Sequence, residues 1–112
     1  MLREHRAQSY RYDAASDRIA LAVRPPANGR AARRVPGSLL VSARGALVGV
    51  DLRGGAPMGE VVMWGPHEDV ASTHDTEVEL ATDEDGDPAE LTLPRASAWV
   101  RDAARTPYRA TS

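Results

Sequence analysis

Apolar and polar positions alternate in pairs of short segments along the chain, and each clear pair encloses a glycine. Residues 38–53 and residues 77–94 are the best examples, with Gly45 and Gly86 at their centres. A period of two indicates half-buried β-strands, and glycine between two such runs favours a hairpin turn. When the two glycines are aligned, the apolar positions of the returning strands coincide. The pattern therefore predicts two copies of one hairpin unit.

Further strands are predicted on either side of these hairpins. Residues 10–23 form a looser hairpin with a turn at 13–17, and residues 60–64 form a short strand. The stretch 24–37, which contains proline and Asn-Gly signals, is predicted to be a loop. Since an isolated hairpin cannot bury its apolar face, we expect the units to pack together. The sequence predicts an all-β domain of roughly six or seven mainly antiparallel strands, shaped as a small roll, a sandwich or an open barrel.

The length of 112 residues is that of a single domain, 1–112. Residues 95–105 have the apolar spacing of a short helix, so we expect a C-terminal helix or extension that covers a sheet edge or face. Residues 1–8 and 106–112 are predicted to be flexible ends.

Composition removes several kinds of chemistry. All 14 basic residues are arginine, and the chain has no cysteine. Without lysine there is no Schiff base and no P-loop lysine, and without cysteine there is no thiol nucleophile, thiolate ligand or disulfide. The opening residues lack the apolar stretch of a signal peptide, and no apolar run approaches the length of a membrane span. We therefore expect a cytoplasmic protein without membrane contact.

The net charge is only −2, but the charges are unevenly distributed. Residues 1–34 carry eight arginines and three acidic residues, whereas residues 60–90 carry eleven acidic residues and no arginine. Strands from the two regions could be neighbours whose outward charges pair across the sheet. The two regions could also pair head to tail between subunits. Pairing across the sheet is the preferred interpretation.

Three arginines and two tryptophans are candidate partner-binding residues: Arg30, Arg33, Arg34, Trp64 and Trp99. No aromatic residue is interleaved with the arginines, so the stacking platform of proteins that bind single-stranded nucleic acid is missing. A solvated loop is the simpler interpretation of the arginines, and nucleic-acid binding is not expected. Trp64 is expected in the core or at its rim.

An acidic stretch contains two histidines that could bind a metal ion. His67, Asp69 and His74 would supply two nitrogens and one oxygen, a donor set of zinc and non-haem iron sites. Their spacing matches no established motif, and a loop does not fix ligand geometry by itself, so a polar surface connection is preferred. A hydrolytic arrangement of Ser72, His74 and Asp75 is weaker, because residues this close in sequence converge poorly and no nucleophile elbow is present.

The segment 82–87 superficially resembles a calcium loop, because Asp83, Asp85 and Asp87 alternate around a glycine. That glycine precedes the third aspartate, whereas in an EF-hand it follows the third acidic position. Asp-Gly between two alternating strands favours a hairpin turn, and we prefer the turn to an ion site.

Three short elements resemble a known family. Tyr12-Asp13, residues 17–21 and residues 45–52 provide a Tyr-Asp opening, an acidic residue before a hydrophobic strand, and a hydrophobic segment with two glycines. The pattern is similar to a small bacterial β-rich domain, domain of unknown function 2283, over roughly the first half of the chain. The resemblance implies a small β domain and brings no catalytic residues to this chain.

No catalytic signature stands out in the sequence. The preferred function is a non-enzymatic protein-interaction or assembly module that self-associates into a homo-oligomer through its β domain, without a cofactor. The alternative is a small metal-dependent enzyme or metal-binding protein that uses the 67–75 loop and a divalent metal ion.

Overall fold

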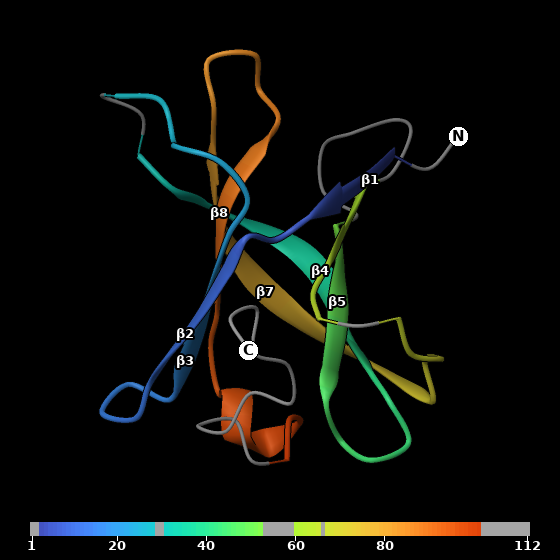
Figure 1. The fold of residues 1–112 in the computed structure, drawn as a ribbon. Helices are drawn as coiled ribbons and strands as arrows, with labels where there is room; N and C mark the ends of the chain where they lie inside the picture. Colours follow the sequence, from blue (N-terminus) through green and yellow to red (C-terminus); the bar gives the residue numbers. More distant parts are fainter. Residues whose placement is uncertain (1–2, 29–30, 53–59, 66, 102–112) are drawn as a thin grey trace.

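The computed structural model describes residues 3–28, 31–52, 60–65 and 67–101. In this part of the chain, eight strands form a single sheet that curls into a half-barrel, and a short 3₁₀ turn follows the last strand (Figure 1). The strands are β1 (Arg3–Arg6), β2 (Ser9–Asp13), β3 (Arg18–Ala22), β4 (Arg33–Val41), β5 (Leu47–Leu52), β6 (Glu60–Met63), β7 (Ser72–Thr82) and β8 (Pro88–Leu93), and the turn is η1 (Ala96–Ala98). The all-β class predicted from the sequence is confirmed.

The two edges of the sheet are joined by one continuous segment. The strand order is β1-β6-β5-β4-β7-β8-β3-β2, and every neighbouring pair is antiparallel except β1 and β6. β1 and β2 lie at opposite ends of this order, yet they follow one another in the chain. Between them, the N–H of Ala7 donates to the carbonyl of Met63 at 2.9 Å, and the N–H of Gln8 donates to the carbonyl of Ala22 at 2.7 Å. The segment therefore bonds to both sides of the curl.

The three predicted hairpins are present as β2–β3, β4–β5 and β7–β8. Gly45 and Gly86 turn the second and third hairpins with φ angles of 85° and 86°. Glycine adopts such angles without the steric cost that a Cβ brings. The turn chemistry that the sequence displays thus fixes these two pairings locally.

A β-bulge in the β4–β5 hairpin changes which side chains reach the main core. The register shifts between Leu40 and Val41, so that Val41 pairs with Leu47. Strict alternation places Val48 on the same face as Val50. In the structure Leu47 joins Val50 in the main hydrophobic cluster, and Val48 is buried outside that cluster. An extra residue on one strand reverses the alternation at that point.

The predicted loop 24–37 is too long. β4 begins at Arg33, which pairs with Leu80 of β7. Pro36 has the character of a strand breaker, but β4 pairs with β5 only from Gly37 onward. The missing N–H of Pro36 therefore removes no bond to β5, and the strand continues through the proline.

The predicted ends also differ from the structure where they are described. Residues 3–6 of the segment expected to be flexible form β1, which pairs with β6. Within 95–101, the described part of the predicted helix, only η1 is helical, because Arg95 at φ 51° and Trp99 at φ −120° leave the helical region on either side of it. Residues 102–112, which include the predicted tail 106–112, lie outside the described residues.

The hydrophobic core fills the inside of the curled sheet and draws side chains from β3 to β8. Tyr10 of β2 stacks on Trp64, which follows β6, with ring centroids 5.5 Å apart. This contact links strands that stand far apart in the sheet order. Burial raises the pKa of Tyr10 to about 12, and the nearby Tyr12 contributes to the same shift. The Tyr10 hydroxyl therefore stays protonated near neutral pH.

Candidate functional site

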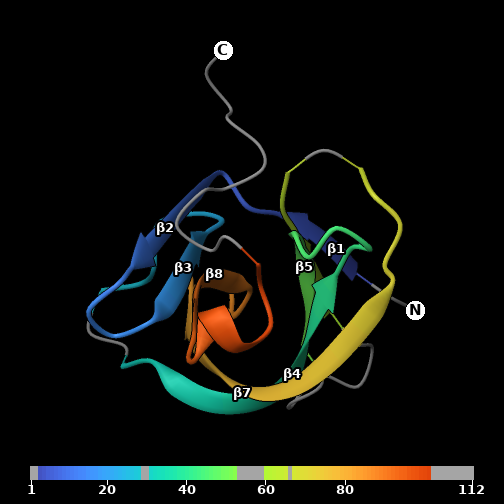
Figure 2. The same ribbon diagram turned by 90° about the horizontal axis from the view of Figure 1, so that it is seen from below.

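One end of the curled sheet is closed by residues 95–101. Viewed from below, η1 lies within the ring of strands (Figure 2). Ala96 is 0% exposed and Val100 is 2% exposed, and both belong to the hydrophobic core cluster. The segment therefore has an inner side that packs against the core and an outer side that faces solvent.

Asp17, in the turn between β2 and β3, holds this segment in place. Its carbonyl accepts the N–H of Ala96 at 2.9 Å, and its carboxylate accepts the N–H of Ser97 at 3.0 Å and the hydroxyl of Ser97 at 2.7 Å. The hydroxyl of Tyr12 donates to the same carboxylate at 2.7 Å. These hydrogen bonds, from Tyr12 first and then from Ser97, lower the pKa of Asp17. The ionised carboxylate is thus fully engaged within the fold.

Backbone strain is concentrated at the same end. Asp17 and Arg95 have φ angles of 54° and 51°, and they are the two non-glycine residues with positive φ in the described part of the chain. A residue with a Cβ pays roughly 1–2 kcal/mol for this conformation, which persists only where the surroundings hold it. The two strained residues belong to segments that bond to each other through the N–H of Ala96. Packing at this end therefore fixes a specific geometry.

The β4–β5 turn supports the other side of the segment. The N–H of Arg101 donates to the carbonyl of Gly45 at 2.8 Å. A Cβ at Gly45 would lie only 2.7 Å from the Cβ of Arg101. Glycine at this turn therefore allows the closing segment to approach the sheet.

Trp99 is exposed at this end and yet held in one orientation. Its side chain is 36% exposed and stacks on the imidazole of His74 in β7, with ring centroids 4.5 Å apart and an interplanar angle of 17°. Nε2 of His74 in turn lies 3.1 Å from the hydroxyl of Ser72. One face of the indole is fixed by the protein, while part of the ring remains open to solvent.

Two arginines flank Trp99 in the sequence. Arg95 and Arg101 are exposed, and neither forms an ion pair within the described residues. The carboxylates of the β2–β3 turn are engaged elsewhere, since Asp13 accepts two hydrogen bonds from its own turn and Asp17 holds the closing segment. We use the name closed-end face for the three exposed residues Arg95, Trp99 and Arg101 of the closing segment. It combines an ordered aromatic ring with two cations.

Buried charged groups occupy the opposite, open end of the sheet. Glu60 and His5 are 9% and 8% exposed, and Nε2 of His5 lies 3.1 Å from Oε1 of Glu60. The guanidinium of Arg24 donates to Nδ1 of His5 at 3.1 Å, and Arg3 pairs with Glu60 at 3.3 Å. Because a guanidinium can only donate, Nδ1 must accept, and the proton of the neutral imidazole lies on Nε2 and points to Glu60.

The β7–β8 turn at the open end is acidic. Oxygens of Asp83, Asp85 and Asp87 lie within 4.8 Å of one another, and among the described residues they are the only potential metal ligands that converge in this way. Arg24 pairs with Asp83 and Asp87 at 3.4 Å, and Arg3 pairs with Asp87 at 3.0 Å. Desolvation raises the pKa of Asp83, but backbone N–H donors and Arg24 outweigh it and lower that pKa. At this hairpin turn, which the sequence predicts, the positive charge beside Asp83 and Asp87 thus comes from the two arginines.

The predicted metal ligands are not brought together as a converging group. His67 and Asp69 are exposed before β7, and His74 lies within β7. The weaker hydrolytic arrangement is also incomplete. Asp75 lies on the opposite face of the strand from His74 and accepts a hydrogen bond from the hydroxyl of Ser38 at 2.8 Å.

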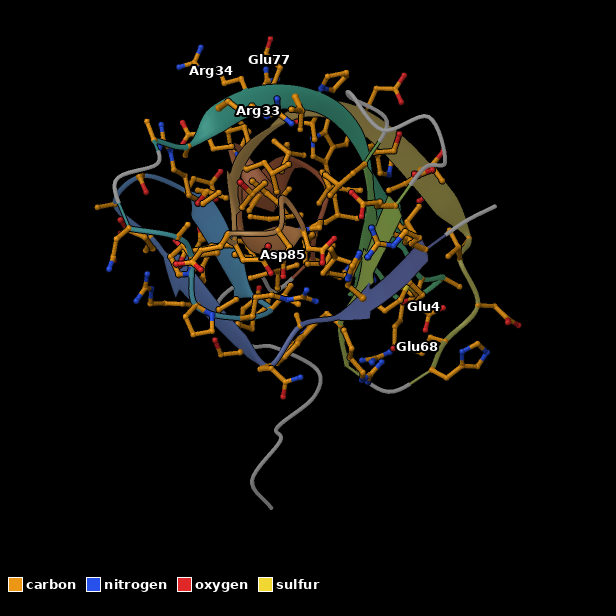
Figure 3. All side chains as sticks on the ribbon, turned by 90° about the horizontal axis from the view of Figure 1, so that it is seen from above. Glu4, Arg33, Arg34, Glu68, Glu77 and Asp85 are labelled. Carbon is orange, nitrogen blue, oxygen red and sulfur yellow. The ribbon has the colours of Figure 1, made fainter. Side chains whose placement is uncertain are left out.

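The predicted arginine cluster is split. Arg30 lies outside the described residues. Arg33 and Arg34 are adjacent in β4, so their side chains point to opposite faces of the sheet, and Arg34 approaches Glu77 at 3.9 Å on the outside of the curl (Figure 3). Trp64 is only 5% exposed and packs in the core, so it offers no binding surface of its own.

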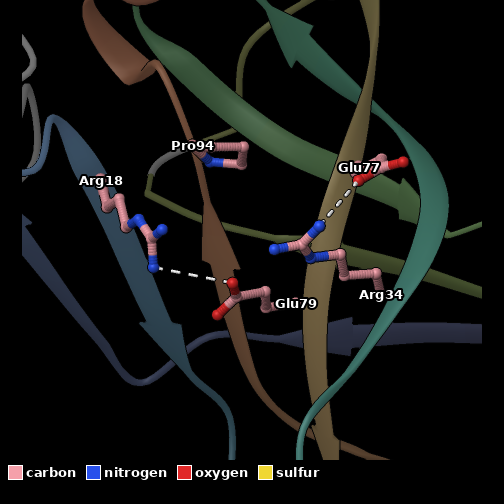
Figure 4. A pocket seen from close by; sticks show the side chains of 5 residues that line it. All are labelled: Arg18, Arg34, Glu77, Glu79 and Pro94. Atoms are coloured by element: carbon pink, nitrogen blue, oxygen red, sulfur yellow. Dashed lines mark ion pairs between the residues drawn. The ribbon is translucent and has the colours of Figure 1, made fainter.

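A small pocket on the outer face of the sheet contains charges that are already paired. Arg18, Arg34, Glu77, Glu79 and Pro94 line a cavity of about 190 Å³ (Figure 4). Arg18 pairs with Glu79 at 3.6 Å, and Arg34 pairs with Glu77 at 3.9 Å. The two positive and two negative side chains of the lining are thus paired with one another.

Pairing across the sheet, the interpretation preferred from the sequence, is confirmed by the ion pairs. Arginines from residues 1–34 pair with acidic residues from 60–90 at both the open end and the outer face: Arg3, Arg18, Arg24 and Arg34. The uneven charge along the chain is therefore partly neutralised by the topology.

Comparison with family models, curated proteins and solved structures finds no match to the chain. The structure thus describes an all-β protein whose curled sheet has the closed-end face at one end and the acidic β7–β8 turn at the other. Within the described residues, no helix has the length and apolar character needed to cross a membrane. The family resemblance in the first half of the chain stays a prediction.

Sequence reasoning identified Trp99 but missed Asp17, Arg95 and Arg101. The tether between Asp17 and Ser97 joins residues 80 positions apart, so no local pattern reveals it. The two arginines that flank a tryptophan were a readable signal, because cations beside an aromatic ring are typical of interaction surfaces.

Proposed function

We propose that the protein is a non-enzymatic interaction module that self-associates and uses the closed-end face as its binding surface. The observation that carries this proposal is Trp99, which is exposed and yet ordered by its stack on His74. A side chain that is already ordered loses little conformational entropy on binding. Tryptophan and arginine are also enriched among the residues that dominate binding energy in protein interfaces.

The same end lacks the convergence that catalysis needs. His74 places its ring against Trp99 and its Nε2 against Ser72, while Asp75 lies on the other face of the strand. Acid–base chemistry requires a positioned pair of groups aimed at one reacting atom. The described geometry of this end therefore supports binding rather than bond breaking.

Self-association agrees with the small size of the domain. A chain of 112 residues without phenylalanine builds a modest core, and small domains bury a smaller fraction of their surface than large ones. Burial of Trp99 against a second copy would add apolar area. A cytoplasmic location belongs to the same proposal, since a chain without cysteine loses no disulfide in a reducing compartment.

Sedimentation velocity on the wild type, Trp99→Ala and Val70→Ala tests this proposal, with native mass spectra to count subunits. Val70 is the matched control, because at 43% exposure it is the other large apolar side chain exposed in the described part of the chain. We expect Trp99→Ala to weaken association by about 30-fold, the effect of losing an interface residue worth about 2 kcal/mol, and Val70→Ala to change it little.

A wild type that stays monomeric at the highest concentration reached contradicts the proposal, and so does a Trp99→Ala variant that associates as strongly as the wild type. The same native spectra report any retained metal mass, which tests the metal prediction for His67, Asp69 and His74.

A further inference from the structure

We infer that the element bound by the closed-end face is the acidic β7–β8 turn of a second copy, so that copies associate head to tail. This inference rests on the proposed function, because it names the partner of the same face. It commits to one occupant, residues 83–87 of another molecule of this chain.

The two surfaces lie at opposite ends of the molecule. β8 runs from the β7–β8 turn at the open end to η1 at the closed end (Figure 1). Seen from above, the labelled Asp85 marks the turn at the open end (Figure 3). One molecule can therefore present its turn to one neighbour and its closed-end face to another.

In the acidic turn and at the closed-end face, the charges that remain after internal pairing are complementary. In the acidic turn, Asp83 and Asp87 pair with arginines, whereas Glu84 and Asp85 are exposed and form no ion pair within the described residues. At the closed-end face, Arg95 and Arg101 are likewise exposed and form no ion pair within the described residues, but their charge is positive. Two anions in the turn thus match two cations at the closed-end face, an arrangement that favours association and fixes its polarity.

The acidic turn is ordered before it binds. The N–H of Asp83 donates to the carbonyl of Asp87 at 2.9 Å, and the N–H of Gly86 donates to the carbonyl of Asp83 at 3.1 Å. The carboxylate of Asp83 also accepts the N–H groups of Asp85 and Asp87 at 2.9 Å. Both partners of the proposed contact are therefore held by internal hydrogen bonds, which reduces the entropy lost on docking.

A contact between two different surfaces of identical molecules is heterologous. Such contacts produce a closed ring when the rotation between copies closes, and an open chain when it does not. A symmetric pair of closed-end faces would instead be limited to a dimer and would bring four arginines together. The charge pattern therefore favours the head-to-tail arrangement over the symmetric dimer.

Two charge-reversed variants test the inference. The turn variant carries Glu84→Arg and Asp85→Arg, and the face variant carries Arg95→Glu and Arg101→Glu. Each variant alone then presents ends of equal sign, and we expect its dissociation constant to rise by about tenfold or more. An equimolar mixture of the two variants restores opposite signs at every contact between unlike variants. We expect native mass spectra of the mixture, with one variant labelled with nitrogen-15, to show assemblies that contain both masses.

The control variant carries Glu4→Arg and Glu77→Arg, which changes the net charge as much as the turn variant does. Both residues are exposed and lie outside the acidic turn and the closed-end face (Figure 3). We expect its association to stay close to that of the wild type. Circular dichroism checks that all variants fold, and if the face variant does not fold, the turn variant and its control alone decide the test.

The possible outcomes separate the two proposals. If the wild type assembles and Trp99→Ala weakens assembly, but the turn variant assembles like the wild type, the head-to-tail inference is overturned and the proposed function stands. If the wild type itself is monomeric, the proposed function fails and the inference fails with it. Loss in each charge-reversed variant and recovery in their mixture supports the inference.

Discussion

At the scale of single residues, Gly45 and Gly86 stand at equivalent turns in different surroundings. Both have φ angles near 85°, so an alanine at either position meets the same backbone strain. A Cβ at Gly45 would also lie 2.7 Å from the Cβ of Arg101, whereas nothing lies within 4 Å of a Cβ at Gly86. The pair therefore separates the cost of the backbone angle from the cost of displacing the closing segment.

Replacement of Gly45 by alanine is expected to lower the free energy of unfolding by about 2–5 kcal/mol, the sum of left-handed strain and overpacking. Gly86→Ala is expected to lose only the strain, about 1–2 kcal/mol. Urea denaturation of the three proteins measures both values. Equal losses at the two positions would show that residues 95–101 do not pack firmly against the β4–β5 turn.

At the scale of elements, β1 and β6 meet through a buried polar pair. His5 and Glu60 face each other across the only parallel pairing in the described sheet, with Arg24 and Arg3 completing their hydrogen bonds. Buried polar groups are tolerated when they have hydrogen-bond partners, and removal of one partner leaves the other without a hydrogen bond. The inward side chain of the N-terminal strand is thus held by polar contacts, in addition to the backbone pairing of β1 with β6.

We expect Glu60→Leu and His5→Leu each to lower the free energy of unfolding by about 1–3 kcal/mol, because each leaves a buried polar partner unsatisfied. The double variant is expected to lose less free energy of unfolding than the sum of the two single losses, since it leaves neither member of the pair buried without its partner. A thermodynamic cycle from urea denaturation gives the coupling energy. Additive losses would mean that the 3.1 Å contact contributes nothing as a pair.

The same pair explains which elements could be predicted from the sequence. The hairpins are local in sequence, and the alternation of apolar and polar residues around Gly45 and Gly86 predicts them. β1 has the sequence Arg-Glu-His-Arg, and its inward position at His5 is polar, so no apolar alternation marks it as a strand. Its partner β6 lies more than fifty residues away, and only the folded sheet brings the two together. At the candidate site the same limit separates Trp99, which the sequence shows, from Asp17, whose role depends on a distant turn.

At the scale of the whole molecule, the segment that includes Ala7 and Gln8 joins the two edge strands β1 and β2 and bonds to the strand next to each, to Met63 of β6 and to Ala22 of β3. Opening either edge would break its hydrogen bonds to Met63 or Ala22, so the edges should open together with the core. The charge pairs across the sheet add contacts between the same regions, although exposed pairs contribute little individually.

Hydrogen exchange should therefore show the amides of Ala7 and Gln8 protected to nearly the same degree as those of β5 and β8, despite their position near the start of the chain. The exposed turn residue Ala14 provides an internal reference for an unprotected amide. Exchange of Ala7 and Gln8 as rapid as that of Ala14 would show that the segment does not join the two edges in solution.

The closure of the sheet by β1 and β2 also has a consequence for synthesis on the ribosome. These strands emerge before all the strands that they join, and β1 must wait for β6 while β3 must wait for β8. Long-range pairings of this kind form late, and unpaired strands are exposed to aggregation in the interval. During that interval β1 is a short, charged segment. Short length and charge both disfavour edge-to-edge pairing with other chains. The polar sequence of β1, which prevents its recognition as a strand from the apolar pattern, thus also protects the nascent chain from aggregation until β6 has been synthesised.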